Sequence, residues 1–128
     1  HSGTSADDAI SFQKGAHGHF VVEAEVDGIP VRFLVDTGAS DVVLSPADAQ
    51  RLGLDLGGLA YTRRYRTANG IVAGAPIRLG QVRLGPIVID DVRASVNGAE
   101  MRRSLLGMSF LDRLSGYEIA NDTLILRP

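Results

Sequence analysis

An aspartate follows directly on an apolar run, a position in which it could act as a catalytic acid. Asp36 comes after the run at residues 31–35 and begins the string Asp-Thr-Gly-Ala. A carboxylate placed there loses hydration, which costs free energy. A second carboxylate close by would make the position useful, because two adjacent acids share one proton and can divide the roles of acid and base. The sequence contains no second Asp-Thr-Gly or Asp-Ser-Gly, so the other acid would have to come from another copy of the chain.

The chemistry of such an acid pair is hydrolysis. The ionised carboxylate takes a proton from a bound water, and the protonated carboxyl donates a hydrogen bond to the carbonyl as it becomes a tetrahedral oxyanion. Water attacks directly, so neither a metal nor a cofactor is needed. The plain alternative is that Asp36 is an ordinary turn or capping aspartate, because Asp-x-Gly is common in turns.

The histidines could suggest a metal site, but their arrangement does not favour one. His17 and His19 form a His-x-His pair in a Gly-containing segment, and His1 is the third histidine of the chain. A zinc site needs at least three ordered protein ligands, and this segment offers only the pair. We therefore predict no metal site.

Two other sets of residues could carry catalysis but are poorly arranged for it. Asp90 and Asp91 are adjacent, so they would point to opposite faces of a continuing strand; solvated acids at a strand end are the better interpretation. Ser40 and Ser109 lack a partner base, because every histidine lies in the first 19 residues. This argues against a Ser-His hydrolase.

Composition limits the class of protein and its partners. A chain of 128 residues fits one domain with a sizeable core, and its net charge of −2 does not point to nucleic acid or to an anionic membrane surface. It has no cysteine, which excludes disulfides and thiol chemistry. No apolar stretch is long enough to span a membrane. Because the chain starts at His1 rather than Met, a signal peptide or anchor could precede it.

The elements around Asp36 read as short strands. Residues 20–26 and 29–35 predict a hairpin around Asp-Gly, and residues 41–44 predict a short strand. Ser45 caps a helix that begins at Pro46 and runs to Leu52, with Asp48 closing a capping box. Residues 61–79 predict a second hairpin with Asn-Gly at its tip and a polar, Arg-rich first arm that projects into solvent.

The rest of the chain continues the β pattern. Strands are predicted at 81–84, 87–96, 117–120 and 123–126, with a short helix at 108–114. Many short strands with two short helices indicate an all-β, barrel-like domain. Residues 1–18 are rich in Ser, Gly, Ala, Asp and His. We predict a flexible N-terminal arm or linker over 1–18 and the folded domain over 19–128.

Three motifs occur in a fixed order along the chain. Residues 36–40 read D-T-G-A-S, residues 67–70 read T-A-N-G, and residues 105–111 read L-L-G-M-S-F-L. With these motifs the chain resembles the retropepsin-like aspartic proteases, in particular the bacterial ones, over about residues 20–127. The resemblance implies an all-β, closed retropepsin-like barrel with two short helices, one lobe per chain, and an active site formed across a homodimer.

The resemblance also implies roles for individual residues. Asp36 is the catalytic acid, Thr37 hydrogen-bonds to the partner's loop, and Gly38 lets the substrate backbone approach closely. The substrate-binding positions lie on this loop and on a flap at the hairpin tip: Ala39, Ser40, Ala68, Asn69, Gly70 and Ile71. The structural motif beneath the loop comprises Leu105, Leu106 and Gly107. Taken alone, the Asn-Gly tip is a plain hairpin turn and the Leu-Leu-Gly string is core packing.

Two functions follow as expectations. The first is a homodimeric aspartic endopeptidase that hydrolyses a protein or peptide bound in extended form. The second is a non-proteolytic module that keeps the fold for dimerisation or peptide binding, which would have no need of the acid at position 36. We expect no cofactor, no nucleic acid, and membrane attachment only through a preceding anchor. The expected location is the periplasm, or the outer side of a membrane to which the protein is anchored.

Overall fold

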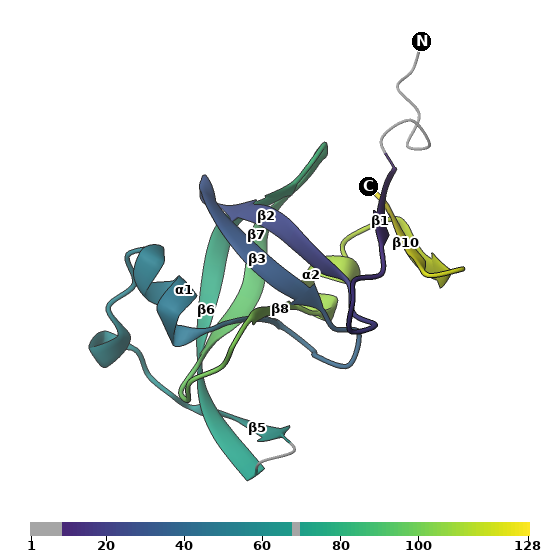
Figure 1. Cartoon of the computed structure of the whole chain (residues 1–128). Coiled ribbons are helices and arrows are strands. Elements are labelled where there is room, and N and C mark those ends of the chain that lie inside the picture. Colours follow the sequence, from purple (N-terminus) through teal and green to yellow (C-terminus); the bar gives the residue numbers. More distant parts are fainter. Residues whose placement is uncertain (1–8, 68–69) are drawn as a thin grey trace.

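The computed structural model describes residues 9–67 and 70–128. Over these ranges the chain forms ten strands, two short α-helices and one 3₁₀-helix (Figure 1). In chain order they are β1 (Ile10–Gln13), β2 (Val21–Val26), β3 (Ile29–Val35), β4 (Val42–Leu44), α1 (Pro46–Arg51), η1 (Leu56–Gly58), β5 (Arg63–Thr67), β6 (Gly70–Leu84), β7 (Ile87–Asn97), β8 (Ser104–Leu106), α2 (Met108–Leu111), β9 (Gly116–Ala120) and β10 (Thr123–Arg127).

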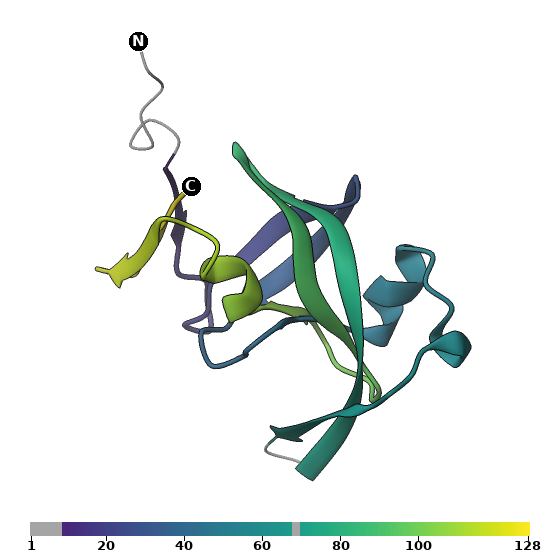
Figure 2. The same cartoon turned by 180° about the vertical axis from the view of Figure 1, so that it is seen from behind.

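Six strands close into a barrel. The larger sheet has the order β2-β3-β8-β4-β7-β6-β5, and an additional pairing of β2 with β6 closes the first six of these strands. This closing pair sets Glu25 opposite Arg83 and Val26 opposite Val82. β5 pairs only with β6, and the two strands extend away from the barrel as a hairpin (Figure 2). The predicted all-β closed barrel with two short helices is confirmed.

Alternating burial explains why the strands form this barrel. In β2, Val22, Ala24 and Val26 are buried while Glu23 and Glu25 are exposed. This two-residue period sends one face of the strand into the core and the other to water. The tight turns follow the sequence as well. Asp27 and Gly28 have φ of 49° and 86°, the positive values that a two-residue hairpin turn requires.

α1 begins at the predicted cap, but its capping box is closed differently. The Asp48 amide donates to Ser45 Oγ at 3.1 Å. The Ser45 amide donates to Ser104 Oγ at 3.0 Å, and that hydroxyl donates to Asp48 Oδ2 at 2.6 Å. Asp48 therefore reaches the Ser45 amide through a serine of β8, which ties α1 to the barrel. α2 ends at Leu111, earlier than the sequence predicts.

β6 is longer than the sequence predicts. It runs unbroken through Gly80, where we expected one hairpin to end and a separate strand to begin. Pairing with β7 continues on both sides of Gly80, and the Gln81 amide donates to Asp27 Oδ1 at 2.9 Å. Asp90 and Asp91 lie within β7 rather than at a strand end, and both are exposed. Asp91 has a φ of 54°, which interrupts the alternation of faces.

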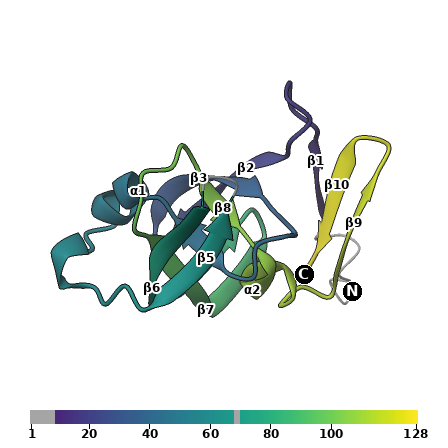
Figure 3. The same cartoon turned by 90° about the horizontal axis from the view of Figure 1, so that it is seen from below.

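A second sheet lies beside the barrel, on the side opposite α1 (Figure 3). Its order is β1-β10-β9, so residues 10–13, which we expected within a flexible arm, form a strand paired with the C-terminal strand. Ile10 and Phe12 pack against the core and hold β1 in place. Their alternation with polar residues spans only four positions, too few to indicate a strand from sequence. The domain boundary itself stays a prediction.

Candidate active site

Asp36 lies at the start of a tight loop that leaves the barrel at the end of β3. Its backbone amide donates to the Leu106 carbonyl at 3.1 Å, and its carbonyl accepts from the Ala39 amide at 3.2 Å. Its carboxylate oxygen Oδ1 accepts a hydrogen bond from the Gly38 amide at 2.9 Å. The side chain is half-buried. The loop therefore fixes the carboxylate in direction while leaving it accessible.

The junction of β8 and α2 supports this loop from beneath. The Met108 and Ser109 amides donate to the carbonyls of Ala39 and Ser40, each at 2.8 Å. A Cβ atom on Gly107 would overlap the Asp41 carbonyl and lie 2.6 Å from the Ala39 carbonyl. Only glycine lets the two backbone segments come this close. The structure thus brings the predicted Leu-Leu-Gly motif directly under the predicted catalytic loop.

The outer residues of the loop face solvent. Thr37, Gly38 and Ser40 are exposed, and Ala39 is half-buried. Over the described residues the Thr37 hydroxyl makes no hydrogen bond. Its position at the surface is compatible with the cross-subunit bond that the family resemblance implies.

A cleft of about 630 Å³ opens beside Asp36. One wall is the Asp36 loop, a second is the β5–β6 hairpin, and a third is the segment that precedes β8. The lining residues are Asp36, Gly38, Ala39, Ser40, Val43, Tyr65, Arg66, Val72, Asn97, Ala99, Glu100, Met101 and Leu105. The cleft joins four residues of the predicted loop to Leu105. It also includes Tyr65, Val72 and Met101, which the sequence analysis did not single out.

The predicted flap is described only in part. Ala68 and Asn69 lie outside the described residues. Gly70 was expected inside the turn but is paired with Thr67 as the first residue of β6, with a φ of 116°. Ile71 is 62% exposed and is not among the residues that line the cleft.

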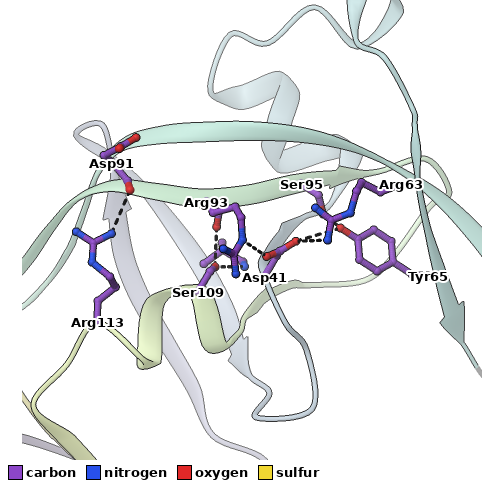
Figure 4. Close-up of polar contacts among 9 residues, drawn as sticks. Asp41, Arg63, Tyr65, Asp91, Arg93, Ser95, Ser109 and Arg113 are labelled. Carbon is purple, nitrogen blue, oxygen red and sulfur yellow. Dashed lines mark hydrogen bonds and ion pairs between the residues drawn. The ribbon is translucent and has the colours of Figure 1, made fainter.

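A buried carboxylate behind the loop connects three elements. The Asp41 side chain is fully buried, and it binds two arginines (Figure 4). Arg93 Nε of β7 donates to Oδ1 at 2.7 Å, and Arg63 Nη2 of β5 lies 3.2 Å from Oδ2. The hydrogen bond and the charge of Asp41 raise the pKa of Arg93 above its ordinary value. A buried carboxylate paired in this way holds its partners firmly, because losing them would leave a charge away from water.

Tyr65 extends this connection into the cleft. Its hydroxyl donates to Ser95 Oγ at 2.8 Å and lies 3.4 Å from Asp41 Oδ2. Its ring packs on Gly74 of β6, where a Cβ atom would collide with it. The network of Asp41, Arg63, Arg93, Tyr65 and Ser95 therefore anchors the base of the β5–β6 hairpin to the strand that follows the Asp36 loop. We call it the Asp41 network.

Sequence analysis missed the Asp41 network for a physical reason. Asp41 begins a buried apolar strand, which is an unusual place for an acid and was the one available signal. Its partners lie 22 and 52 positions away, so only the folded sheet brings them together.

Ser109 has a structural role in this region. Its hydroxyl accepts from the Val42 amide at 2.8 Å and donates to the Arg93 carbonyl at 2.6 Å. These bonds join β4, β7 and α2. Neither described histidine is among the residues around it. The Ser109 hydroxyl therefore stabilises the barrel by linking these elements.

The described residues include no group of three or more His, Cys, Asp or Glu side chains that could hold a metal ion. No helix within residues 9–67 and 70–128 is long and apolar enough to cross a membrane.

The fold and the site define a retropepsin-like protein, and comparison with known proteins gives the same result. A model of the family described as "gag-polyprotein putative aspartyl protease" matches residues 22–113. The chain belongs to this family. A retropepsin-like aspartic protease from Rickettsia conorii, known from a crystal structure, is 44% identical; the match covers 93% of this chain and 89% of that one, with a TM-score of 0.86.

Two further comparisons set the extent of the likeness. The protease of EIAV, solved in complex with the inhibitor HBY-793, is 21% identical with a TM-score of 0.64, covering 78% of this chain and 91% of that one. At this level of identity, the likeness to the EIAV protease supports the fold and nothing further. An uncharacterized protein of Rickettsia prowazekii (strain Madrid E) is 44% identical over 117 residues, which is 91% of this chain and 50% of the relative. The chain thus spans about half the length of this curated relative. Family and fold together support a protease function.

Proposed function

We propose that the protein is an aspartic endopeptidase whose active site is completed by a second copy of the chain. The observation that carries this proposal is the position of Asp36. Its carboxylate is held by the Gly38 amide and faces a cleft between its own loop and the β5–β6 hairpin, in a retropepsin-like barrel. An acid so placed can meet its symmetry mate and share a proton with it.

The reaction uses the two Asp36 carboxyl groups and one water. The ionised carboxylate accepts a proton from the water, which attacks the peptide carbonyl. The protonated carboxyl hydrogen-bonds the developing oxyanion and then supplies the proton that the leaving amine needs. The substrate lies extended between the loop and the flap, because such a cleft accepts a strand-like peptide.

The second sheet supports the proposed homodimer. β9 is an edge of the order β1-β10-β9, and its Ile119 side chain is 51% exposed. An unpaired edge that carries an exposed apolar side chain is a ready surface for another strand. A two-fold axis at this edge would pair β9 with β9 of the partner and make one continuous sheet.

The alternative function is a non-proteolytic module that dimerises or binds peptides. It needs the barrel, the hairpin and the cleft but no acid in the loop. Both functions use the same fold, so only the role of Asp36 distinguishes the alternative from the protease.

The test is cleavage of a denatured protein by wild type and by Asp36→Asn. The amide keeps the shape of the side chain but can neither share the proton nor act as base, so we expect turnover to be abolished. The matched control, Asp90→Asn, neutralises an exposed acid that lies outside the cleft and should cleave like wild type. Undiminished turnover by a clean Asp36→Asn preparation, with an unchanged circular dichroism spectrum, would remove Asp36 from the mechanism.

A further inference from the structure

The cleft beside Asp36 continues into a second pocket. Met101 and Leu105 line the cleft and also line a neighbouring pocket of about 580 Å³. Val21 and Leu34 add to the apolar floor of this second pocket. The two spaces therefore share a wall, and a peptide that lies over Asp36 can reach both.

The rim of the second pocket carries two arginines and two histidines. His17 and His19 come from the segment between β1 and β2, and Arg102 and Arg103 come from the segment before β8. All four side chains are exposed, and no acidic residue lines the pocket. Among the ion pairs of the described residues, none involves Arg102 or Arg103. The charges of the two arginines are thus available to a ligand.

Besides Asp36, three acids line the hollows on either side of the second pocket, and none of them lines the second pocket itself: Glu100 lines the cleft, and two others line a third hollow. Glu23 and Asp48 line this third hollow on the far side of Arg102 and Arg103, together with Arg32 and Arg51. Arg51 pairs with Asp48 at 3.1 Å. Arg32 lies directly opposite Glu23 across the β2–β3 hairpin. Among the described residues no ion pair joins Glu23, Asp48 or Glu100 to Arg102 or Arg103, so the positive charge of these two arginines remains available at the mouth of the second pocket.

We infer that this second pocket selects an acidic side chain of the substrate, so that the protein prefers peptides with Asp or Glu a few positions from the bond that is cleaved. The inference rests on the proposed function, whose substrate it specifies. Side chains of an extended peptide alternate between faces, so an apolar residue over the cleft and an acid in the second pocket can come from one strand. In a homodimer the pocket occurs twice, and acids on either side of the bond would be favoured.

The expected preference is moderate. The arginines are exposed, so an ion pair with a substrate carboxylate is weakened by water, although guanidinium and carboxylate can form paired hydrogen bonds. We expect a Glu peptide to bind about threefold to tenfold more tightly than its Gln counterpart at the best position, and a Lys peptide to bind more weakly than either.

The experiment measures binding rather than turnover. A matched set of fluorescent peptides carries an apolar centre and a single Glu, Gln or Lys that is moved outward on either side. Dissociation constants are measured by anisotropy with Asp36→Asn, which cannot consume the peptides. Arg102→Gln/Arg103→Gln in this background should bring the Glu-to-Gln affinity ratio to about one, and Arg102→Glu/Arg103→Glu should reverse it in favour of Lys.

A matched control separates the pocket from overall charge. Arg78→Gln/Arg83→Gln removes the same charge from exposed positions of β6 that line none of these hollows, and should keep the Glu preference. His17→Gln/His19→Gln tests the opposite wall and should reduce the preference. Equal affinity for Glu and Gln peptides at every position, or a preference that survives loss of both arginines, would overturn the inference.

The outcome also distinguishes this inference from the proposed function. If wild type cleaves neutral and acidic peptides equally well and Asp36→Asn binds them equally, the protease stands and the acidic preference fails. If Glu peptides bind more tightly in an Arg102- and Arg103-dependent way but wild type cleaves none of them, the pocket stands and the protease fails.

Discussion

Gly107 has no side chain, and the position of the Asp36 loop depends on that. Its α-carbon faces the carbonyls of Ala39 and Asp41, so a single methyl group would push the loop away from β8. Both obstacles are backbone atoms, which cannot turn aside as a flexible side chain would. We expect Gly107→Ala to lower the free energy of unfolding by about 1–3 kcal/mol, the usual cost of overpacking, and to abolish cleavage through displacement of Asp36.

Urea denaturation of Gly107→Ala measures this effect, and Gly116→Ala is its control. An added Cβ on Gly116 meets nothing within 4 Å. That substitution should change stability by less than about 0.5 kcal/mol or stabilise slightly, because alanine lowers the entropy of the unfolded chain. Equal stability of the two variants would show that the loop can move away from Gly107 at no cost.

At the scale of elements, the hairpin of β5 and β6 is anchored to the barrel at its base. The base is held by the Asp41 network, in which Arg63 is the one arginine that belongs to the hairpin. Its side chain is 42% exposed, so the pair it forms should contribute less than about 1 kcal/mol to stability. Its larger effect should be on where the hairpin lies over the substrate.

We therefore expect Arg63→Met to raise KM severalfold with little change in Tm. Arg93→Met is the matched comparison, since it removes the other arginine from the same carboxylate but belongs to the barrel. That variant should lower Tm, because the fully buried Asp41 then keeps only the longer of its two ion pairs. Steady-state kinetics and thermal unfolding of both variants decide the matter. Parallel losses of Tm and activity in the two variants would contradict a positioning role for Arg63.

The hairpin tip gives a second prediction at this scale. Gly70 has a φ of 116°, a backbone conformation that a β-branched residue does not tolerate. A Cβ there meets nothing within 4 Å, so the strain is local. We expect Gly70→Val to reduce kcat/KM strongly by distorting the flap, with a stability loss of about 1–3 kcal/mol at most.

Gly28→Val is the control for that prediction. Gly28 has a φ of 86° and open space around it, but it lies in the β2–β3 turn. It should show a similar loss of stability with kcat/KM unchanged. Should Gly70→Val cleave peptides normally, or unfold the domain outright, the hairpin would not be the flap.

The elements also show which parts of the fold could be predicted from the sequence. Local signals were sufficient where neighbours in sequence are neighbours in space: the Asp-Gly hairpin, the Ser45 cap and the alternation of β2. Contacts across long separations were not accessible. The closure of β2 on β6, the pairing of β1 with β10, and the arginines around Asp41 all depend on which strands meet in the folded barrel.

The candidate site likewise contains residues that the sequence motifs indicated and residues that only the fold brings in. Asp36 and Gly38 stand in one short string, and Gly107 belongs to a second string, so the motifs placed them correctly under and around one loop. Tyr65 and Met101 stand in no recognisable pattern, because they enter the cleft only through the register of the hairpin and the path of the segment before β8. The motifs therefore indicated Asp36 and the backbone that supports its loop. Most of the surface that lines the cleft could be identified only from the folded structure.

At the scale of the whole molecule, one chain supplies one Asp36, and the proposed mechanism needs two. This requirement can be tested by mixing wild-type chains with Asp36→Asn chains at constant total concentration after unfolding and refolding them together. If subunits pair at random and both acids are required, activity falls with the square of the wild-type fraction. An equal mixture should then retain about one quarter of the wild-type activity, whereas independent sites would retain about one half.

The mixing experiment needs a variant that assembles like wild type, so sedimentation of Asp36→Asn alone comes first. Dilution of wild type gives the independent check, since a site that is shared between chains must lose specific activity as the dimer dissociates. Ile119→Arg places a charge on the exposed edge of β9 and should shift that loss to higher protein concentration. A linear mixing curve, together with specific activity that stays constant far below the dimer dissociation constant, would mean that a single chain carries a complete site and that Asp36 acts without a symmetry mate.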